Sequence, residues 1–131
     1  MLKSALLAIL VFVCANSSSA ADWLQLASTD TYTLYAAPTT IRRDGSIASM
    51  VHLVDYKEGR TLDGASPYKS TRLQQENDCG QAKARLVYVS LHSEAMAGGE
   101  VVLSDAALER WEAVPPGSGR ETVWKFVCGR S

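Results

Sequence analysis

The chain of 131 residues carries 13 basic and 14 acidic side chains, which gives a formal net charge of −1 at pH 7. Hydrophobic residues make up 47% of the chain and charged residues 21%, values that are ordinary for a folded domain and argue against disorder. Charges of both signs are interspersed without a basic excess, so general nucleic-acid binding is excluded as a leading hypothesis.

The first 20 residues have the pattern of a secretory signal peptide. Lys3 gives a positively charged start, residues 6–13 are uniformly apolar, and small residues follow at 17–21. Two cleavage positions fit this pattern, after Ala20 or after Ala21. We therefore expect an exported protein that resides in the periplasm or at the cell surface.

No transmembrane span is expected, because the apolar run is shorter than the roughly 20 helical residues that cross a bilayer. Cys14 follows Val13, whereas a lipoprotein signal has a small residue before its acylated cysteine, so cleavage at the Ser/Ala stretch is favoured over lipidation. Residues 22–131 then form a single domain of about 110 residues.

Alternating and β-branched runs predict five or six strands, at residues 23–26, 31–35, 47–56, 68–76, 84–92 and 100–103. Pro38 is predicted to break the second strand, Gly45 to supply the positive φ of a turn, and residues 57–67 to form a loop. The strand at 47–56 has apolar residues on both faces, which predicts a central position. The mostly polar strand at 68–76 is predicted to be exposed.

The end of the chain changes to helical spacing. Ser118 and Glu121 form a capping box, and Val123, Phe126 and Val127 then follow at the spacing of one helix face. Gly129 is a natural C-terminal stop. The sequence therefore predicts an α+β domain in which this helix packs on an antiparallel sheet.

Two cysteines remain once the signal peptide is removed, Cys79 and Cys128. In an exported chain such a pair most often forms a disulfide, because the compartment is oxidising. A zinc site lacks the ligand spacing, and a redox pair lacks the C-x-x-C motif. We therefore predict one structural disulfide.

A series of motifs in chain order resembles a known family. Trp23 is followed by E-x-D-C ending at Cys79, then by W-x-x-V-P-P-G-S from Trp111 to Ser118, and by the terminal Cys128. Together they resemble the bacterial surface-adhesin protein E family, and the resemblance covers nearly all of the chain after the signal peptide. It implies a small exported domain with an antiparallel sheet and a C-terminal helix, whose best-known behaviour is adhesion to host matrix proteins.

The sequence departs from the family pattern at two places. Ala36-Ala37 stands where an acidic residue is expected, and His52 stands where a tryptophan is common. Because adhesion in this family is carried by surfaces rather than by a portable motif, no binding residue is transferred to this chain.

No catalytic constellation is recognisable. His52 and His92 lack a nearby carboxylate or thiolate, so each is interpreted as a packed or hydrogen-bonded strand residue rather than a metal ligand. A G-x-S-x-G motif is missing, and Gly98-Gly99 is too short to cradle a phosphate. We expect no enzyme activity, no metal and no cofactor.

The polar strand at 68–76 is the candidate interaction site, with Tyr68, Lys69 and Arg72 as its proposed residues. At a sheet edge it would offer unpaired backbone groups to an extended segment of a macromolecular partner, or to a second copy in a homodimer. The sequence thus favours an exported, non-catalytic binding module. The alternative is a periplasmic structural or accessory protein of the cell envelope.

Overall fold

The computed structural model describes residues 22–106 and 109–129. The predicted signal peptide and Cys14 lie outside these residues. The elements are β1 (Leu24–Ser28), β2 (Tyr32–Asp44), β3 (Ile47–Leu62), β4 (Ser66–Asp78), β5 (Lys83–His92), the 3-10 turn η1 (Ala95–Ala97), β6 (Val101–Asp105), β7 (Glu112–Ala113) and α1 (Gly119–Cys128).

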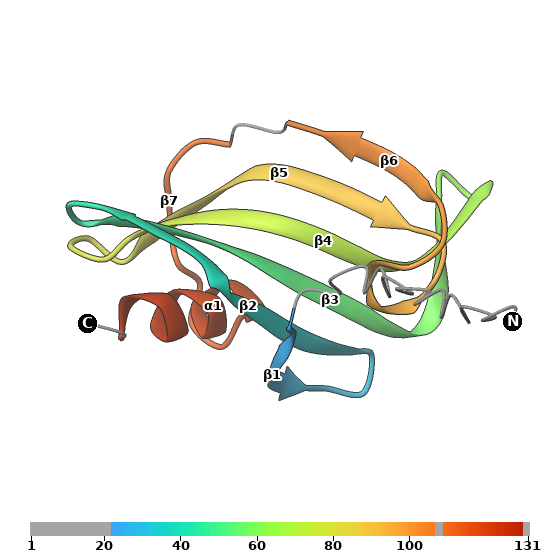
Figure 1. The fold of residues 1–131 in the computed structure, drawn as a ribbon, viewed down its shortest axis with the longest axis horizontal. Helices are drawn as coiled ribbons and strands as arrows, with labels where there is room; N and C mark the ends of the chain where they lie inside the picture. The colour runs from blue at the N-terminus through green and yellow to red at the C-terminus, as the bar shows by residue number, and fades with distance from the viewer. Residues whose placement is uncertain (1–21, 107–108, 130–131) are drawn as a thin grey trace, which may run out of the picture.

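The strands form one antiparallel sheet in the order β1-β2-β3-β4-β5-β6, and the short β7 pairs with β5. Figure 1 shows this order from β1 at the bottom to β6 at the top, with α1 at the lower left. Each strand pairs with its neighbour in the sequence, so the topology is a meander, which needs only short connections. The predicted α+β fold is confirmed.

One face of the sheet is covered by α1. Val123 and Val127 are fully buried against Leu34 and Met50, and Phe126 packs at the side of this cluster. Ser118 caps the helix as predicted, because its hydroxyl oxygen accepts the Glu121 N–H at 3.1 Å. We call this side of the sheet the helix face.

The predicted disulfide is present. Cys79, in the turn after β4, is bonded to Cys128 in the last turn of α1, with their Cα atoms 5.4 Å apart. Beside it, the indole N–H of Trp124 donates to the Asp78 carbonyl at 3.0 Å. Both bonds fix the end of the helix to the end of β4.

The prediction that Pro38 breaks the second strand is wrong. β2 continues to Asp44, and its pairing with β3 shifts register between Ala37 and Arg42. Within the shift the Thr40 hydroxyl donates to the Ala37 carbonyl at 2.7 Å and accepts the Val51 N–H at 2.9 Å. A proline is tolerated at such a bulge because the ladder there does not need its missing N–H.

The predicted loop at residues 57–67 is also wrong. β3 runs on to Leu62 and β4 begins at Ser66, so the two strands extend as a hairpin around a tight turn. Gly64 adopts a φ of +72° in that turn, which is the conformation that favours glycine. Gly59 lies inside the strand, within the register shift between Asp55 and Arg60, where a glycine marks a bulge rather than a loop.

The strand predicted to be exposed, at residues 68–76, is instead central. β4 pairs with β3 on one side and with β5 on the other. Among its buried polar side chains, Ser70, Gln75 and Asn77 find partners: the Gln75 amide donates to Asn77 Oδ1 at 2.6 Å, and the Asn77 amide donates to the Ala48 carbonyl at 3.0 Å. Hydrogen bonding therefore makes a polar strand compatible with the interior of the sheet.

None of the helices in residues 22–106 and 109–129 has the length and apolar character required to span a membrane.

Candidate functional site

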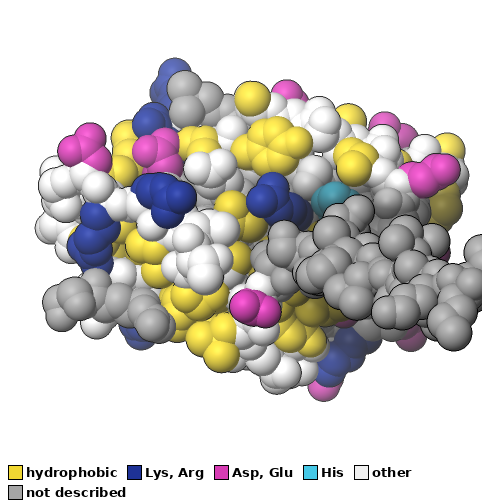
Figure 2. All heavy atoms as spheres, in the orientation of Figure 1, with side chains coloured by type: hydrophobic (Ala, Val, Ile, Leu, Met, Phe, Trp, Pro, Cys, Tyr) yellow, Lys and Arg dark blue, Asp and Glu magenta, His cyan; other side chains and the backbone are white. Residues whose placement is uncertain are grey.

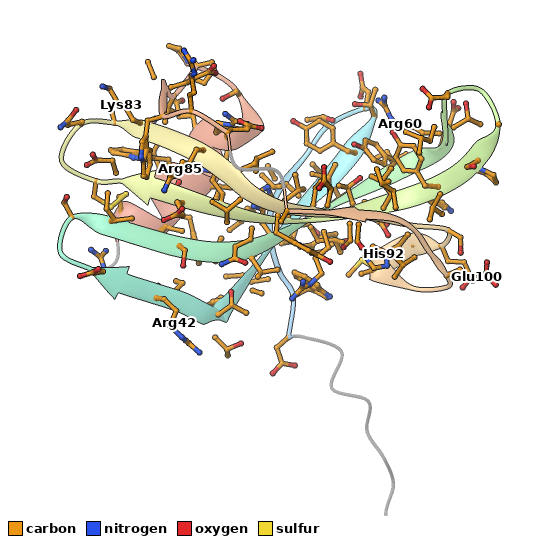
Figure 3. All side chains as sticks on the ribbon, turned by 90° about the horizontal axis from the view of Figure 1, so that it is seen from above. Arg42, Arg60, Lys83, Arg85, His92 and Glu100 are labelled. Carbon is orange, nitrogen blue, oxygen red and sulfur yellow. A yellow bond between two sulfur atoms is a disulfide. The ribbon has the colours of Figure 1, made fainter. Side chains whose placement is uncertain are left out.

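The two histidines lie on opposite faces of the sheet. His52 is on the helix face, where its register partner is Ala36, a member of the core. His92 pairs with Ser70 and lies on the other face; Figure 3 shows it on the side of the sheet away from α1. A metal site shared by the two histidines is therefore ruled out by geometry, and the described residues contain no cluster of three or more metal-ligating side chains.

A serine and a histidine do meet on β5. The Ser90 hydroxyl and His92 Nε2 lie 2.8 Å apart, a distance compatible with a nucleophile and its base. Both side chains are buried, however, and burial together with the charge of Arg72 lowers the pKa of His92. The pair is interpreted as a hydrogen bond that satisfies two buried polar groups.

The proposed interaction residues do not form one surface. The Tyr68 ring packs edge-on against Tyr56 with centroids 5.9 Å apart, in the extended β3–β4 hairpin. Lys69 is exposed in the same hairpin, whereas Arg72 is half-buried and close to His92 on the opposite face from α1. Whether any of the three contacts a partner stays a prediction, but the edge position that motivated their choice does not exist.

The sheet has a different free edge, at β6. Within the described part of the chain, β6 pairs only with β5, so its outer side has no neighbouring strand. Val101 and Leu103 are 57% and 41% exposed there. We call the strand Val101–Asp105 the β6 edge.

The β6 edge is held in place by the turn that precedes it. The Ser70 hydroxyl donates to the Glu94 carbonyl at 2.6 Å and accepts the Ala97 N–H at 2.9 Å, while Asp55 Oδ1 accepts the Met96 N–H at 3.0 Å. Met96 and Ala97 have φ values of 56° and 59°, which non-glycine residues rarely adopt. Such backbone strain persists only when surrounding contacts enforce it, so this turn is fixed to β3 and β4.

Sequence reasoning predicted a strand here but missed its position at the edge. The signal that was available is the apolar run Val101-Val102-Leu103, which contains no lysine, arginine or proline. These are the residues that usually protect an edge strand from pairing.

The face of the molecule drawn in Figure 2 is of mixed character. Figure 2 shows Lys and Arg alongside Asp and Glu on the visible face, with hydrophobic side chains between them. This distribution matches the interspersed charge of the sequence. It favours a partner recognised by local shape and pairing rather than by one dominant charge.

Comparison with protein families gives one match. The model of the family described as "Surface-adhesin protein E" matches residues 23–129, which is nearly all of the described chain. None of the curated proteins compared with this chain matches it.

Solved structures of Haemophilus influenzae protein E are similar in fold. Crystal form II superimposes with a TM-score of 0.58 at 14% sequence identity, covering 79% of this chain and 91% of that one. Another structure of the same protein gives a TM-score of 0.57 at 15% identity, with 82% and 93% covered. Protein E from non-typeable Haemophilus influenzae gives 0.54 at 15% identity, with 82% and 84% covered. At this level of identity the similarity concerns the fold.

Proposed function

Because the chain belongs to the surface-adhesin protein E family, we propose that it is a non-catalytic binding module that acts outside the cytoplasm and captures a macromolecular partner. The observation that best supports this proposal is the free β6 edge, where Val101 and Leu103 are exposed. An extended segment of the partner adds to β6 as a further strand. Its backbone supplies the hydrogen bonds, and the two apolar side chains supply specificity.

The other free edge fits this role less well. In the described chain β1 also pairs with one strand only, and Leu24 is 46% exposed there. Leu26 and Ala27, however, turn toward the core, and α1 contacts β1. A partner strand at β1 would meet one exposed apolar side chain instead of two.

Export is part of the proposal. The predicted signal peptide is removed after Ala20 or Ala21, and N-terminal sequencing of the exported protein should begin at Ala21 or Asp22. A mature protein that starts at a lipid-modified Cys14 would contradict this cleavage. Fractionation and protease treatment of intact cells would separate surface display from an accessory role confined to the periplasm.

The binding surface is tested by a charge at the β6 edge. Val101→Lys replaces an exposed apolar side chain, against which the side chains of a partner strand would pack, by a charged one. It should weaken binding to immobilised host matrix glycoproteins by about tenfold or more, which corresponds to roughly 1.4 kcal/mol. Leu24→Lys is the matched control at the other edge and should bind as the wild type does. Surface plasmon resonance measures both.

Three other results are informative. Equal weakening by both variants, or by neither, would contradict the assignment of β6 as the binding edge. Failure of the wild type to bind any matrix glycoprotein would contradict the proposed partner class. If sedimentation shows a dimer that Val101→Lys dissociates, and matrix proteins do not bind, the β6 edge joins two copies of this chain instead.

A further inference from the structure

A cavity of about 330 Å³ lies between the N-terminal end of α1 and the helix face of the sheet. Leu34, Val54, Leu73 and Leu86 form its apolar wall, and Tyr32 and Tyr56 add aromatic rings. This volume is within the lower part of the range found for small-molecule sites. The cavity is thus large enough for a compact organic molecule.

Two buried polar atoms on this face have no hydrogen-bond partner among the described residues, His52 Nδ1 and Thr71 Oγ1. His52 lines the cavity itself. In the β3–β4 register His52 lies opposite Leu73 and Val54 lies opposite Thr71, so His52 and Thr71 are diagonal neighbours. Thr71 is not a lining residue, so only His52 can meet a ligand there. Leaving a buried polar group unpaired costs free energy, and a polar ligand beside His52 would recover part of it.

Polar side chains converge at the same end of the cavity. The Gln75 amide donates to the Arg120 carbonyl at 3.3 Å, which holds the first turn of α1 against β4. The pKa of His52 is lowered to about 4, first by burial and then by the charge of Arg120. His52 is therefore neutral at pH 7, and the guanidinium of Arg120 lies close enough to affect it.

The charged side chains that line the cavity are all positive. Arg60 and Arg120 are both lining residues, and none of the described lining residues is acidic. Arg60 stacks over the Tyr56 ring at 4.4 Å, and Figure 3 shows it on the same side of the sheet as α1. Arg120 also forms an ion pair with Glu109 at 3.2 Å, but Glu109 does not line the cavity. This charge distribution favours an anion over a cation or a neutral molecule.

We propose that this cavity binds a small carboxylate with an apolar body, of the size of an aromatic or branched-chain acid. The body lies against Leu73 and Leu86, and the carboxylate faces Arg120, whose planar guanidinium matches carboxylate geometry. The site is separate from the β6 edge and does not depend on the function proposed for it. It makes this chain a receptor for a small metabolite as well as a module for a macromolecule.

The test compares an acid with its uncharged counterpart. Phenylpropionate and phenylpropanol share the same body, and each is titrated into the isotope-labelled full chain while amide NMR shifts are recorded. Phenylpropionate should shift the amides of Leu73, Gly119 and Arg120, and should bind about tenfold more tightly than phenylpropanol.

Arg120→Met removes the charge and keeps the aliphatic stem, so it should abolish the preference for the acid. Arg85→Met is the matched control: Arg85 is also half-buried and ion-paired, with Glu76 at 3.1 Å, but it does not line the cavity. Arg85→Met should still bind phenylpropionate more tightly than phenylpropanol. If Arg120→Met does not give a folded spectrum, Leu86→Trp, which fills the cavity, should abolish binding of both compounds.

Several outcomes would overturn the proposal. One is that neither phenylpropionate nor phenylpropanol shifts the amides of the lining residues. Another is that the two compounds bind with equal affinity. A third is that Arg85→Met and Arg120→Met lose the preference for the acid to the same extent. Val101→Lys should leave phenylpropionate binding unchanged, so failure of this site and failure of the β6 edge are distinguished.

Discussion

Removal of the disulfide should destabilise the domain strongly. The bond joins Cys79 to Cys128 across a sequence separation of 49 residues. For a loop of that length the chain-entropy relation gives about 4 kcal/mol, and losses measured in small secreted domains are about 2–5 kcal/mol. The helix α1 has ten residues, and helices of this length are marginal on their own in water. We therefore expect Cys79→Ser/Cys128→Ser to lower the free energy of unfolding by about 2–5 kcal/mol.

Guanidinium unfolding monitored by tryptophan fluorescence measures this loss, because Trp124 lies beside the disulfide and reports on the docking of α1. The melting temperature should fall by about 10 °C or more, since each kcal/mol shifts it by about 4–8 °C in a domain of this size. Wild-type protein kept reduced is the control and should match the double variant. A loss below about 1 kcal/mol would refute the reasoning, because it would mean that packing alone holds α1 in place.

Three further substitutions test packing, capping and titration. Val123→Ala should cost about 2–3 kcal/mol in thermal unfolding, because it removes buried methyl groups and leaves a cavity; a neutral result would show that α1 is loosely packed. Ser118→Ala should cost only about 1 kcal/mol, since it removes a cap, and a larger loss would mean that Ser118 does more than cap. Folded His52 has a pKa of about 4 against 6.5 unfolded, so the unfolded chain binds the extra proton as the pH falls. The free energy of unfolding should therefore fall by about 2 kcal/mol between pH 7.5 and 5. His52→Leu should reduce this dependence to the part that His92 contributes, since the pKa of His92 is also lowered; an unchanged slope would show that His52 is not held neutral.

The elements that were predictable from the sequence depend on local signals. Ser118, Glu121 and Gly129 mark the ends of α1, and the spacing of Val123 and Val127 identifies its buried face. The disulfide was predictable from the cysteine count and the oxidising compartment. These signals are contained within short segments, so they do not depend on how the sheet is arranged.

The errors concern position within the sheet. The polar side chains of β4 indicated exposure, but Ser70, Gln75 and Asn77 are buried because the fold supplies their hydrogen-bond partners. Pro38 indicated a break and residues 57–67 a loop, but Pro38 and Gly59 both lie within register shifts of continuous strands. Partners and register are set by neighbouring strands, and therefore periodicity within one segment could not reveal them.

The cavity was not predictable for the same reason. Its residues come from β2 and the turn before it, from β3, β4 and β5, and from the start of α1. His52 alone gave no hint of Arg120 nearby. Likewise, the hydrophobic run of β6 predicted a strand, whereas its place at the edge follows from the order of the whole sheet.

Hydrogen exchange with and without a bound matrix glycoprotein tests most directly whether β6 is the binding edge. A partner strand would form hydrogen bonds with the outward backbone groups of Val101–Asp105, so their amide exchange should slow on binding. Exchange in Leu24–Ser28, at the other edge, should stay unchanged. Protection of β1, or of the hairpin around Tyr68 and Lys69, with β6 unchanged would contradict the proposal.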